Sequence, residues 1–204
     1  MTRSRIRVAR EDDGASAAAI YQPFVETSVI SFEAAPPDSS EMSRRIVDTV
    51  ADFPWLICEI GGRAAGYAYA TRHRVRAAYL WSVDTSVYVD RQYWRLGIGR
   101  GLYASLFAIL AAQGFYNAYA GITLPNPASV ALHEAAGFKP VGVYRRVGFK
   151  HDGWHDVGWW ELTLQAHSAS PQPPLALAAL RSRPEWESLV ASGEPFIRPT
   201  AAIR

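Results

Sequence analysis

The 204-residue chain contains one cysteine and no long apolar run, and both absences restrict what it can be. Because Cys58 is alone, no disulfide can form within the chain, which suits a reducing compartment. No segment approaches the roughly 18 apolar residues of a membrane-spanning helix, and none has the apolar core of a signal peptide. We therefore expect a soluble, cytoplasmic protein.

The chain has no large excess of positive or of negative charge. Lysine and arginine together number 21 against 19 acidic residues, so the formal net charge is +2. Such a balance favours neither nucleic acid nor a membrane surface as a partner. Lys139 and Lys150 are the only lysines, and the prevalence of arginine and alanine is typical of GC-rich bacteria. A bacterial source is therefore expected.

Motifs for metal and serine chemistry are also missing. His151, Asp152, His155 and Asp156 lie close in the sequence, but an Asp-Gly turn separates them and no second ligand group occurs. We expect no bound metal. The chain has no Gly-x-Ser-x-Gly segment, which leaves serine hydrolysis without support.

What the chain does contain is a strand, a glycine loop and a helix in succession. Residues 86–89 are β-branched and aromatic, as in buried strands. The glycine-rich residues 95–101 lead into a helix, which is predicted from apolar residues three or four positions apart: Leu102, Tyr103, Leu106, Phe107 and Leu110. Gly114 is expected to cap this helix in the left-handed conformation. Bare glycine amides at a helix N-terminus suit a phosphate group.

Two known phosphate loops fit this segment poorly. A Walker loop requires Gly-Lys-Ser/Thr, and no lysine occurs here. A Rossmann loop has the spacing G-x-G-x-x-G and an acidic residue about 20 positions on. Here the spacing is G-x-G-x-G, and the downstream residues are Tyr119-Ala120-Gly121. A tight turn without a ligand is the alternative interpretation.

The remaining elements predict one mixed α/β domain over residues 1–167. Strands are expected near residues 6–9, 55–60, 63–71, 78–89, 118–123, 139–148 and 155–164. Helices are expected near residues 12–21, 38–50, 102–113 and 128–136, with Pro23 breaking or kinking the first. Prolines are frequent from residue 168, so residues 168–204 are expected to form an appended arm, either of short helices or disordered.

A series of short motifs occurs in order between Ile6 and Leu164. They are Ser31-Phe32-Glu33, Pro54-Trp55-Leu56, Gly66-Tyr67-Ala68-Tyr69-Ala70, Arg76-Ala77-Ala78-Tyr79, Ser86-Val87-Tyr88-Val89, Leu124-Pro125-Asn126, Leu132-His133-Glu134-Ala135-Ala136-Gly137-Phe138 and Gly148-Phe149-Lys150-x-x-Gly153-Trp154-x-Asp156-Val157. The series resembles the phosphinothricin and methionine sulfoximine branch of the GCN5-related N-acetyltransferases (GNAT). The resemblance implies a mixed, mostly antiparallel sheet flanked by helices, with a splayed strand pair that binds acetyl-CoA.

The resemblance also implies which residues bind acetyl-CoA. Backbone amides of Val87, Tyr88 and Val89 would pair with the pantetheine arm as an added strand does. The pyrophosphate would bind the loop, which is similar to the family pattern Gln/Arg-x-x-Gly-x-Gly/Ala; its residues are Trp94, Arg95, Leu96, Gly97, Ile98, Gly99 and Arg100. Trp94 departs from that pattern. Asn126 would bond the pantetheine or the start of the next helix, and a plain turn or N-cap is its alternative.

Three residues are candidates for proton transfer. Asp84 stands where this branch usually has a glutamate proposed as the base, and its shorter side chain favours relay through water. An acidic residue at a strand edge is the alternative. His133 stands where many acetyltransferases have a tyrosine acid, and it would protonate the thiolate or accept the amine proton, unless it is structural. Tyr88 is a further hydroxyl near the thioester, with packing as its alternative.

The acceptor site is predicted from cationic and aromatic residues. An amino acid with an anionic or tetrahedral side group requires arginine and tyrosine donors, which Arg74, Arg76 and Tyr79 provide along one edge. A solvated basic edge is the alternative interpretation. Phe32 and Glu33 would form a wall of the pocket and receive the α-amino group.

Together these features predict an N-acetyltransferase that moves acetyl from acetyl-CoA to phosphinothricin, methionine sulfoximine or methionine sulfone. Direct attack of the amine in a ternary complex is expected, because Cys58 lies within a strand that reads as buried and is a poor candidate for an acetyl-cysteine. Acetylation of another amine, or acyl-CoA binding without catalysis, are the alternatives. The resemblance favours a homodimer.

Overall fold

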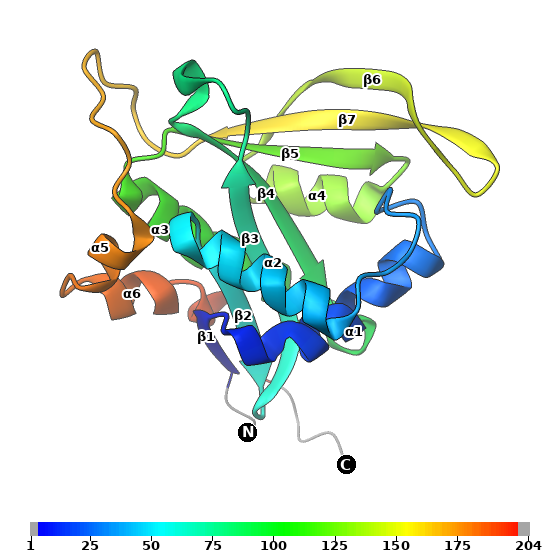
Figure 1. Cartoon of the computed structure of the whole chain (residues 1–204), viewed down its shortest axis with the longest axis horizontal. Helices are drawn as coiled ribbons and strands as arrows, with labels where there is room; N and C mark the ends of the chain where they lie inside the picture. The colour runs from blue at the N-terminus through cyan, green and yellow to red at the C-terminus, as the bar shows by residue number, and fades with distance from the viewer. Residues whose placement is uncertain (1–3, 200–204) are drawn as a thin grey trace.

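Seven strands form one sheet in the order β1-β2-β3-β4-β5-β7-β6, and helices cover both of its faces (Figure 1). The computed structural model describes residues 4–199. The strands are β1 (Ser4–Val8), β2 (Trp55–Ile60), β3 (Arg63–Arg72), β4 (Ser82–Val89), β5 (Asn117–Leu124), β6 (Lys139–Lys150) and β7 (Gly153–Thr163). The helices are α1 (Gly14–Glu26), α2 (Ser39–Asp52), α3 (Ile98–Gln113), α4 (Pro127–Ala135), α5 (Leu177–Arg181) and α6 (Trp186–Ala191).

The β4–β5 pair is parallel, whereas the other strand pairs of the sheet are antiparallel. The two strands pair over Ser82–Asp84 and Asn117–Tyr119 alone. Beyond that point β4 continues along β3 and β5 continues along β7, so β4 and β5 diverge. The expected mixed, mostly antiparallel sheet with a splayed strand pair is confirmed.

Two apolar cores lie on the two faces of the sheet. One joins α3 to β2, β3 and β4, with Leu102, Leu106 and Leu110 fully buried. The other joins α1 and α2 to the opposite face, where Trp55 and Tyr67 are buried. Because side chains alternate along a strand, neighbouring residues of β4 face different cores. Its two faces therefore carry different chemistry.

Two local predictions differ from the structure. Pro23 does not break α1, which continues to Glu26 and buries Phe24 and Val25 against the second core, and a kink at Pro23 stays a prediction. The strand predicted from residue 78 begins only at Ser82, because residues 77–79 form a 3-10 turn. In both places, packing and chain reversal outweighed the local sequence preference.

The C-terminal segment packs on the domain beside β1 and α3 (Figure 1). Leu177 and Leu180 have no exposed surface and belong to the same core as α3. Further on, the backbone N–H of Arg198 donates to the Leu96 carbonyl in the glycine loop at 2.8 Å. The described part of the arm thus adds to the core, while a boundary at residue 168 stays a prediction. Residues 200–204 lie outside the described residues.

Gly193 makes the closest approach between the arm and α3. A Cβ at this position would collide with the Gly101 carbonyl and lie 2.8 Å from the Ser105 hydroxyl oxygen. We expect Gly193→Ala to lower the free energy of unfolding by about 1–3 kcal/mol, because the inserted methyl has no space. Urea denaturation measures the change. Gly142→Ala is the control, since no heavy atom lies within 4 Å of its added Cβ, and equal midpoints for the two variants would contradict the prediction.

No helix among residues 4–199 is long and apolar enough to cross a membrane. Cys58 lies in β2 with no exposed surface, and burial raises the pKa of its thiol to about 12. A thiol with so high a pKa is a weak nucleophile at neutral pH.

Candidate active site

A cleft opens where β4 and β5 diverge. It is lined by Ile30, Thr85, Ser86, Val87, Tyr88, Tyr103, Gly121, Ile122, Thr123, Asn126, Ser129 and His133. Four residues predicted from the sequence, Val87, Tyr88, Asn126 and His133, are therefore brought together. Because β4 has no strand partner on this side beyond Asp84, its backbone can pair with an extended ligand. The pantetheine arm of acetyl-CoA has that shape and hydrogen-bonding capacity, so the cleft fits it.

The glycine loop lies at the N-terminus of α3. Gly97 is the N-cap in the left-handed conformation, with φ of 82°, and it offers no side-chain cap. The first helical hydrogen bond runs from the Gly101 N–H to the Gly97 carbonyl at 2.9 Å, so the amides of residues 98–100 precede it. Such amides suit an anion, as expected for the pyrophosphate loop. Trp94 lies beside it, and its indole N–H donates to the Val89 carbonyl at the end of β4 (2.9 Å).

Each loop glycine also meets another part of the chain. A Cβ at Gly97 would collide with the Phe196 carbonyl, and one at Gly101 would lie 2.7 Å from the Gly193 carbonyl. A Cβ at Gly99 would lie 3.0 Å from a methyl group of Leu132. The arm and Leu132 of α4 therefore require small residues in this loop, for which the sequence analysis gave phosphate binding or a tight turn as the interpretations.

Asn126 is the N-cap of α4, where its side-chain oxygen accepts from the Ser129 N–H at 3.2 Å. Thus the N-cap interpretation describes the contact in the structure. The side chain also lines the cleft, so a contact with acetyl-CoA stays a prediction.

His133 is buried and its ring is held at both nitrogens. Nδ1 lies 2.8 Å from the Ser129 carbonyl, which can only accept, so this nitrogen carries the proton. Nε2 lies 2.8 Å from the Tyr103 hydroxyl, which therefore donates to it. Burial lowers the pKa of His133, with the Ser129 contact acting in the opposite direction. These contacts and the lowered pKa favour a neutral imidazole that accepts from Tyr103, a residue that the sequence analysis assigned only to packing.

This arrangement predicts the protonation state of His133. We expect a neutral imidazole with the proton on Nδ1 at pH 7, observable by ¹⁵N NMR. Because the pKa is lowered by folding, the unfolded chain binds the proton first as pH falls below the ordinary value of about 6.5. The free energy of unfolding should therefore decrease in that range by more than in a His133→Gln variant. A doubly protonated ring at pH 7 would contradict this expectation.

Asp84 lies at the point where β4 and β5 separate. Its carboxylate Oδ1 is 2.7 Å from His73 Nδ1, and Oδ2 is 4.0 Å from the Arg74 guanidinium. Burial raises the pKa of Asp84, while the His73 hydrogen bond and Arg74 act to lower it. His73 was not a candidate in the sequence analysis, since a single histidine in a loop carries no signal without its partner.

Tyr88 faces the opposite side of the sheet from the α3 core. Its ring packs edge to face against Tyr21 and Phe24, with 4.8 and 5.3 Å between the ring centroids. Burial raises the pKa of Tyr88 well above its ordinary value, with Tyr69 and Tyr21 adding to the effect. The phenol therefore keeps its proton at neutral pH. Tyr88 packs against aromatic residues and also lines the cleft, so a packing role and a role near the thioester are compatible.

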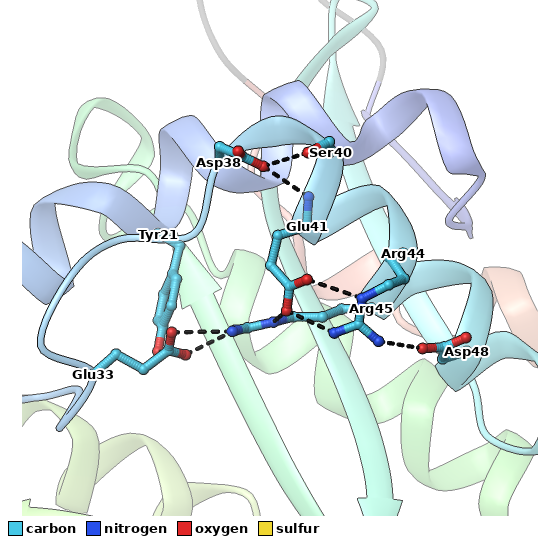
Figure 2. A network of polar contacts seen from close by, with 8 residues as sticks. All are labelled: Tyr21, Glu33, Asp38, Ser40, Glu41, Arg44, Arg45 and Asp48. Carbon is cyan, nitrogen blue, oxygen red and sulfur yellow. Dashed lines mark hydrogen bonds and ion pairs between the residues drawn. The ribbon is translucent and has the colours of Figure 1, made fainter.

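Glu33 belongs to a network of polar contacts with Tyr21 and with residues of α2 (Figure 2). Both of its carboxylate oxygens accept from Arg45, at 2.8 and 3.1 Å, and Oε1 also accepts from the Tyr21 hydroxyl. Arg45 also bonds Glu41, and it lowers the pKa of Glu33. Because its charge is already balanced, Glu33 is less available to an ammonium group than the sequence suggested. Its role toward the α-amino group stays a prediction.

The predicted acceptor residues fall into separate places within one chain. Arg74 and Arg76 line a cavity beside Phe53 and the arm residue Pro174. Tyr79 packs edge to face on His73, with 5.8 Å between the ring centroids. Phe32 lies elsewhere, against Gly148 in the β6–β7 hairpin. Their joint role in acceptor binding stays a prediction.

A further cavity of about 240 Å³ lies over β3 beside α2. It is lined by Tyr21, Met42, Arg45, Asp48, Thr49, Trp55, Tyr67, Tyr69 and Thr71. Asp84 lies between this cavity and the cleft. Its strand partner Thr71 lines the cavity, and its neighbour Thr85 lines the cleft. No cluster of three metal-ligating side chains occurs within residues 4–199.

This geometry, a splayed strand pair above a glycine loop, agrees with the comparisons. The family model described as "Acetyltransferase (GNAT) domain" matches residues 6–159, and the chain belongs to this family of acetyl-CoA-dependent N-acetyltransferases. The chain is 40% identical over 169 residues to phosphinothricin N-acetyltransferase of Streptomyces viridochromogenes, covering 83% of this chain and 90% of the relative. It is 29% identical to L-methionine sulfoximine/L-methionine sulfone acetyltransferase of Salmonella typhimurium, covering 80% and 96%.

A solved structure has the same architecture. The phosphinothricin acetyltransferase of Sinorhizobium meliloti, in complex with acetyl-CoA, superposes with a TM-score of 0.78 at 32% sequence identity. The match covers 83% of this chain and 92% of that one.

Proposed function

We propose that this protein transfers the acetyl group of acetyl-CoA to the α-amino group of phosphinothricin or a close analogue, such as methionine sulfoximine or methionine sulfone. The observation that carries the proposal is the cleft between β4 and β5, with titratable side chains on both faces of the sheet beside it. Tyr103 and His133 lie on the α3 and α4 side. Asp84 and Tyr88 share the other face of β4, because they are an even number of residues apart.

The chain's own residues account for the steps of the reaction. When bound, acetyl-CoA supplies the thioester carbonyl. The acceptor arrives as an ammonium ion and must lose a proton before its nitrogen can attack, which requires a base at the Asp84 end of the cleft. Tyr88, which keeps its proton, is the hydroxyl that we assign to the leaving sulfur. His133 accepts from Tyr103 and so fixes the wall of the cleft.

The cavity beside α2 supports a small polar acceptor. It places the Tyr21 and Tyr69 side chains next to the strand position of Asp84, while Arg45 in the same cavity is already bonded to Glu33 and Glu41. Tyrosine hydroxyls are donors that suit an anionic or tetrahedral side group. The indole N–H of Trp55, which also lines this cavity, is buried and lacks a hydrogen-bond partner within the described chain. An acceptor oxygen would satisfy it.

We also propose that two copies form a homodimer through the β6–β7 hairpin. β6 is an edge strand, and Val141, Val143, Tyr144, Val147 and Phe149 on it are exposed. An exposed apolar edge of this kind is typical of an interface. Analytical ultracentrifugation should show a dimer for the wild type and a monomer for Val143→Asp; a wild-type monomer at micromolar concentration would overturn this assignment. A cytoplasmic location stays a prediction.

The first experiment is a thiol-release assay with acetyl-CoA and a panel of acceptors. The panel contains phosphinothricin, methionine sulfoximine, methionine sulfone, the twenty amino acids and simple polyamines. Saturable turnover with one of the first three acceptors supports the proposal. Turnover only with another amine redirects the substrate, and silence with acetyl-CoA still bound favours a binding protein without catalysis.

A further inference from the structure

His73 bonds the acid–base residue Asp84, and its side chain is the more buried of the two, with 13% exposed against 30% for Asp84. The residue follows β3 and its backbone N–H bonds the Ser82 carbonyl, which brings the ring over the start of β4. The imidazole Nδ1 is 2.7 Å from Asp84 Oδ1, and the side chain retains 13% of its exposure. An ionised carboxylate can only accept a hydrogen bond, so Nδ1 carries the proton. Nε2 makes no hydrogen bond to any residue between 4 and 199.

The ring is fixed from several sides. It stacks on Tyr119 of β5, with ring centroids 4.4 Å apart and an interplanar angle of 21°. Tyr79 and Trp159 contact it edge to face, at 5.8 and 6.4 Å. Stacking and the carboxylate together set the direction in which Nε2 points. A histidine that served only in packing would require neither the hydrogen bond to the Asp84 carboxylate nor an Nε2 without a partner.

The charged and titratable groups around the ring come from three strands and one loop. Asp84 on β4 bonds it directly, and Arg74 on its own loop reaches within 4.0 Å of the same carboxylate. Tyr79 and Tyr119 present rings rather than charges. Burial raises the pKa of Tyr119, and Glu161 on β7 adds to this effect. Asp84 is thus the anion in direct contact with His73, and the positive charge of Arg74 partly offsets the negative charge of Asp84.

We propose that His73 is the general base for the acceptor amine, and that Asp84 is a positioning residue that acts through it. A lone carboxylate is a poor base for an ammonium ion near neutral pH, whereas imidazole changes protonation in that range. Asp84 holds the Nδ1–H tautomer and balances the positive charge that forms on the ring. The inference rests on the proposed acetyl transfer, and it replaces the predicted water relay at Asp84 with a side chain.

The proton and electron balance is simple. The acceptor ammonium gives one proton to His73 Nε2, and the ring becomes an imidazolium that bonds Asp84. The freed lone pair forms the new C–N bond at the carbonyl carbon, and the C–S bond breaks with its electrons on sulfur. The second amine proton leaves the nitrogen as the sulfur gains one, so the products are the acetamide and the free thiol. His73 then returns its proton to water.

His73→Phe tests this proposal, because phenylalanine keeps a ring over Tyr119 but cannot accept a proton. We expect kcat with an amino-acid acceptor to fall by about 10²-fold or more at pH 7, while KM for acetyl-CoA is unchanged. The deficit should shrink as pH rises, since more of the acceptor is then neutral in solution. Methoxyamine, which is already neutral at pH 7, should be acetylated at a nearly unchanged rate if it is accepted by the wild type.

His167→Phe is the matched control. This histidine also stacks on a tyrosine, Tyr116, and makes one hydrogen bond to the Asn117 side chain, but it has no carboxylate partner. Its kinetics should equal those of the wild type. Added imidazole should restore part of the activity of His73→Ala, which a purely structural role for His73 would not allow.

A measurement without turnover completes the test. In the wild type, ¹⁵N NMR at pH 8 should show His73 protonated on Nδ1 and bare on Nε2, and in Asp84→Ala the Nε2–H tautomer should appear. Wild-type turnover together with an unaffected His73→Phe overturns the inference and leaves the proposed function standing. No wild-type turnover on any acceptor overturns the proposed function instead, and an Nε2–H tautomer in the wild type overturns the inference independently.

Discussion

Replacing Asp84 by asparagine should lower kcat at pH 7 by about 10²–10⁴-fold, the range that general acid–base groups supply. The substitution keeps the size of the side chain but removes the charge that stabilises an imidazolium at His73, 2.7 Å away. The new amide N–H can also face Nδ1 and favour the wrong tautomer. Binding of acetyl-CoA, measured by calorimetry, should be nearly unchanged, because the glycine loop at Gly97 is a separate element.

Asp152→Asn is the control for this loss of charge. Asp152 lies in an exposed turn with φ of 57°, a conformation that asparagine tolerates well. This variant should keep the wild-type kcat and pH–rate profile. An Asp84→Asn enzyme with the same profile as the wild type would remove Asp84 from the reaction, and His73 with it.

Gly99→Asp should weaken acetyl-CoA by about 10- to 100-fold in KM. The position lies in the first turn of α3, where the pyrophosphate is expected to meet the helix amides. At an effective dielectric constant near 20, two unit charges about 5 Å apart repel by about 3 kcal/mol, and salt reduces this figure. Isothermal titration calorimetry with CoA measures the effect independently of the acceptor.

Gly99→Asn separates charge from size in this experiment. Asparagine adds a side chain of the same shape, with the same crowding against Leu132 (3.0 Å from the added Cβ), but no charge. We expect it to bind CoA more tightly than Gly99→Asp does, with a difference that shrinks at high salt. Equal affinities for the aspartate and asparagine variants would show that the anion does not bind at this loop.

Features with a local cause were predictable from the sequence. Gly114 closes α3 with φ of 100°, because only glycine adopts that conformation without a steric penalty. Asp38 caps α2 through its bond to the Glu41 N–H at 2.8 Å, as the spacing of these two residues suggested. The β2–β3 hairpin turns at two left-handed glycines, Gly61 and Gly62. Each depends on residues that are neighbours in the chain.

Site roles that depend on distant partners were not predictable. Glu33 was assigned to the acceptor amine, yet Arg45, twelve positions on, neutralises it (Figure 2). Tyr103 was assigned to the core, yet it bonds His133, thirty positions away. The sequence shows which side chains carry charge or protons, but not which of them have already been paired.

The sequence by itself determined the order of strands and helices, the caps, the glycine loop and the acetyltransferase class, because these depend on short-range periodicity and on motifs in order. The resemblance implied a splayed strand pair, but tertiary structure alone decided that β4 and β5 separate after Asp84, that His73 bonds its carboxylate, and that the arm passes over Gly97. These features depend on strand register and on close packing between segments far apart in the chain. The composition of the sequence and the spacing of its motifs do not indicate how far apart such segments lie in the folded chain.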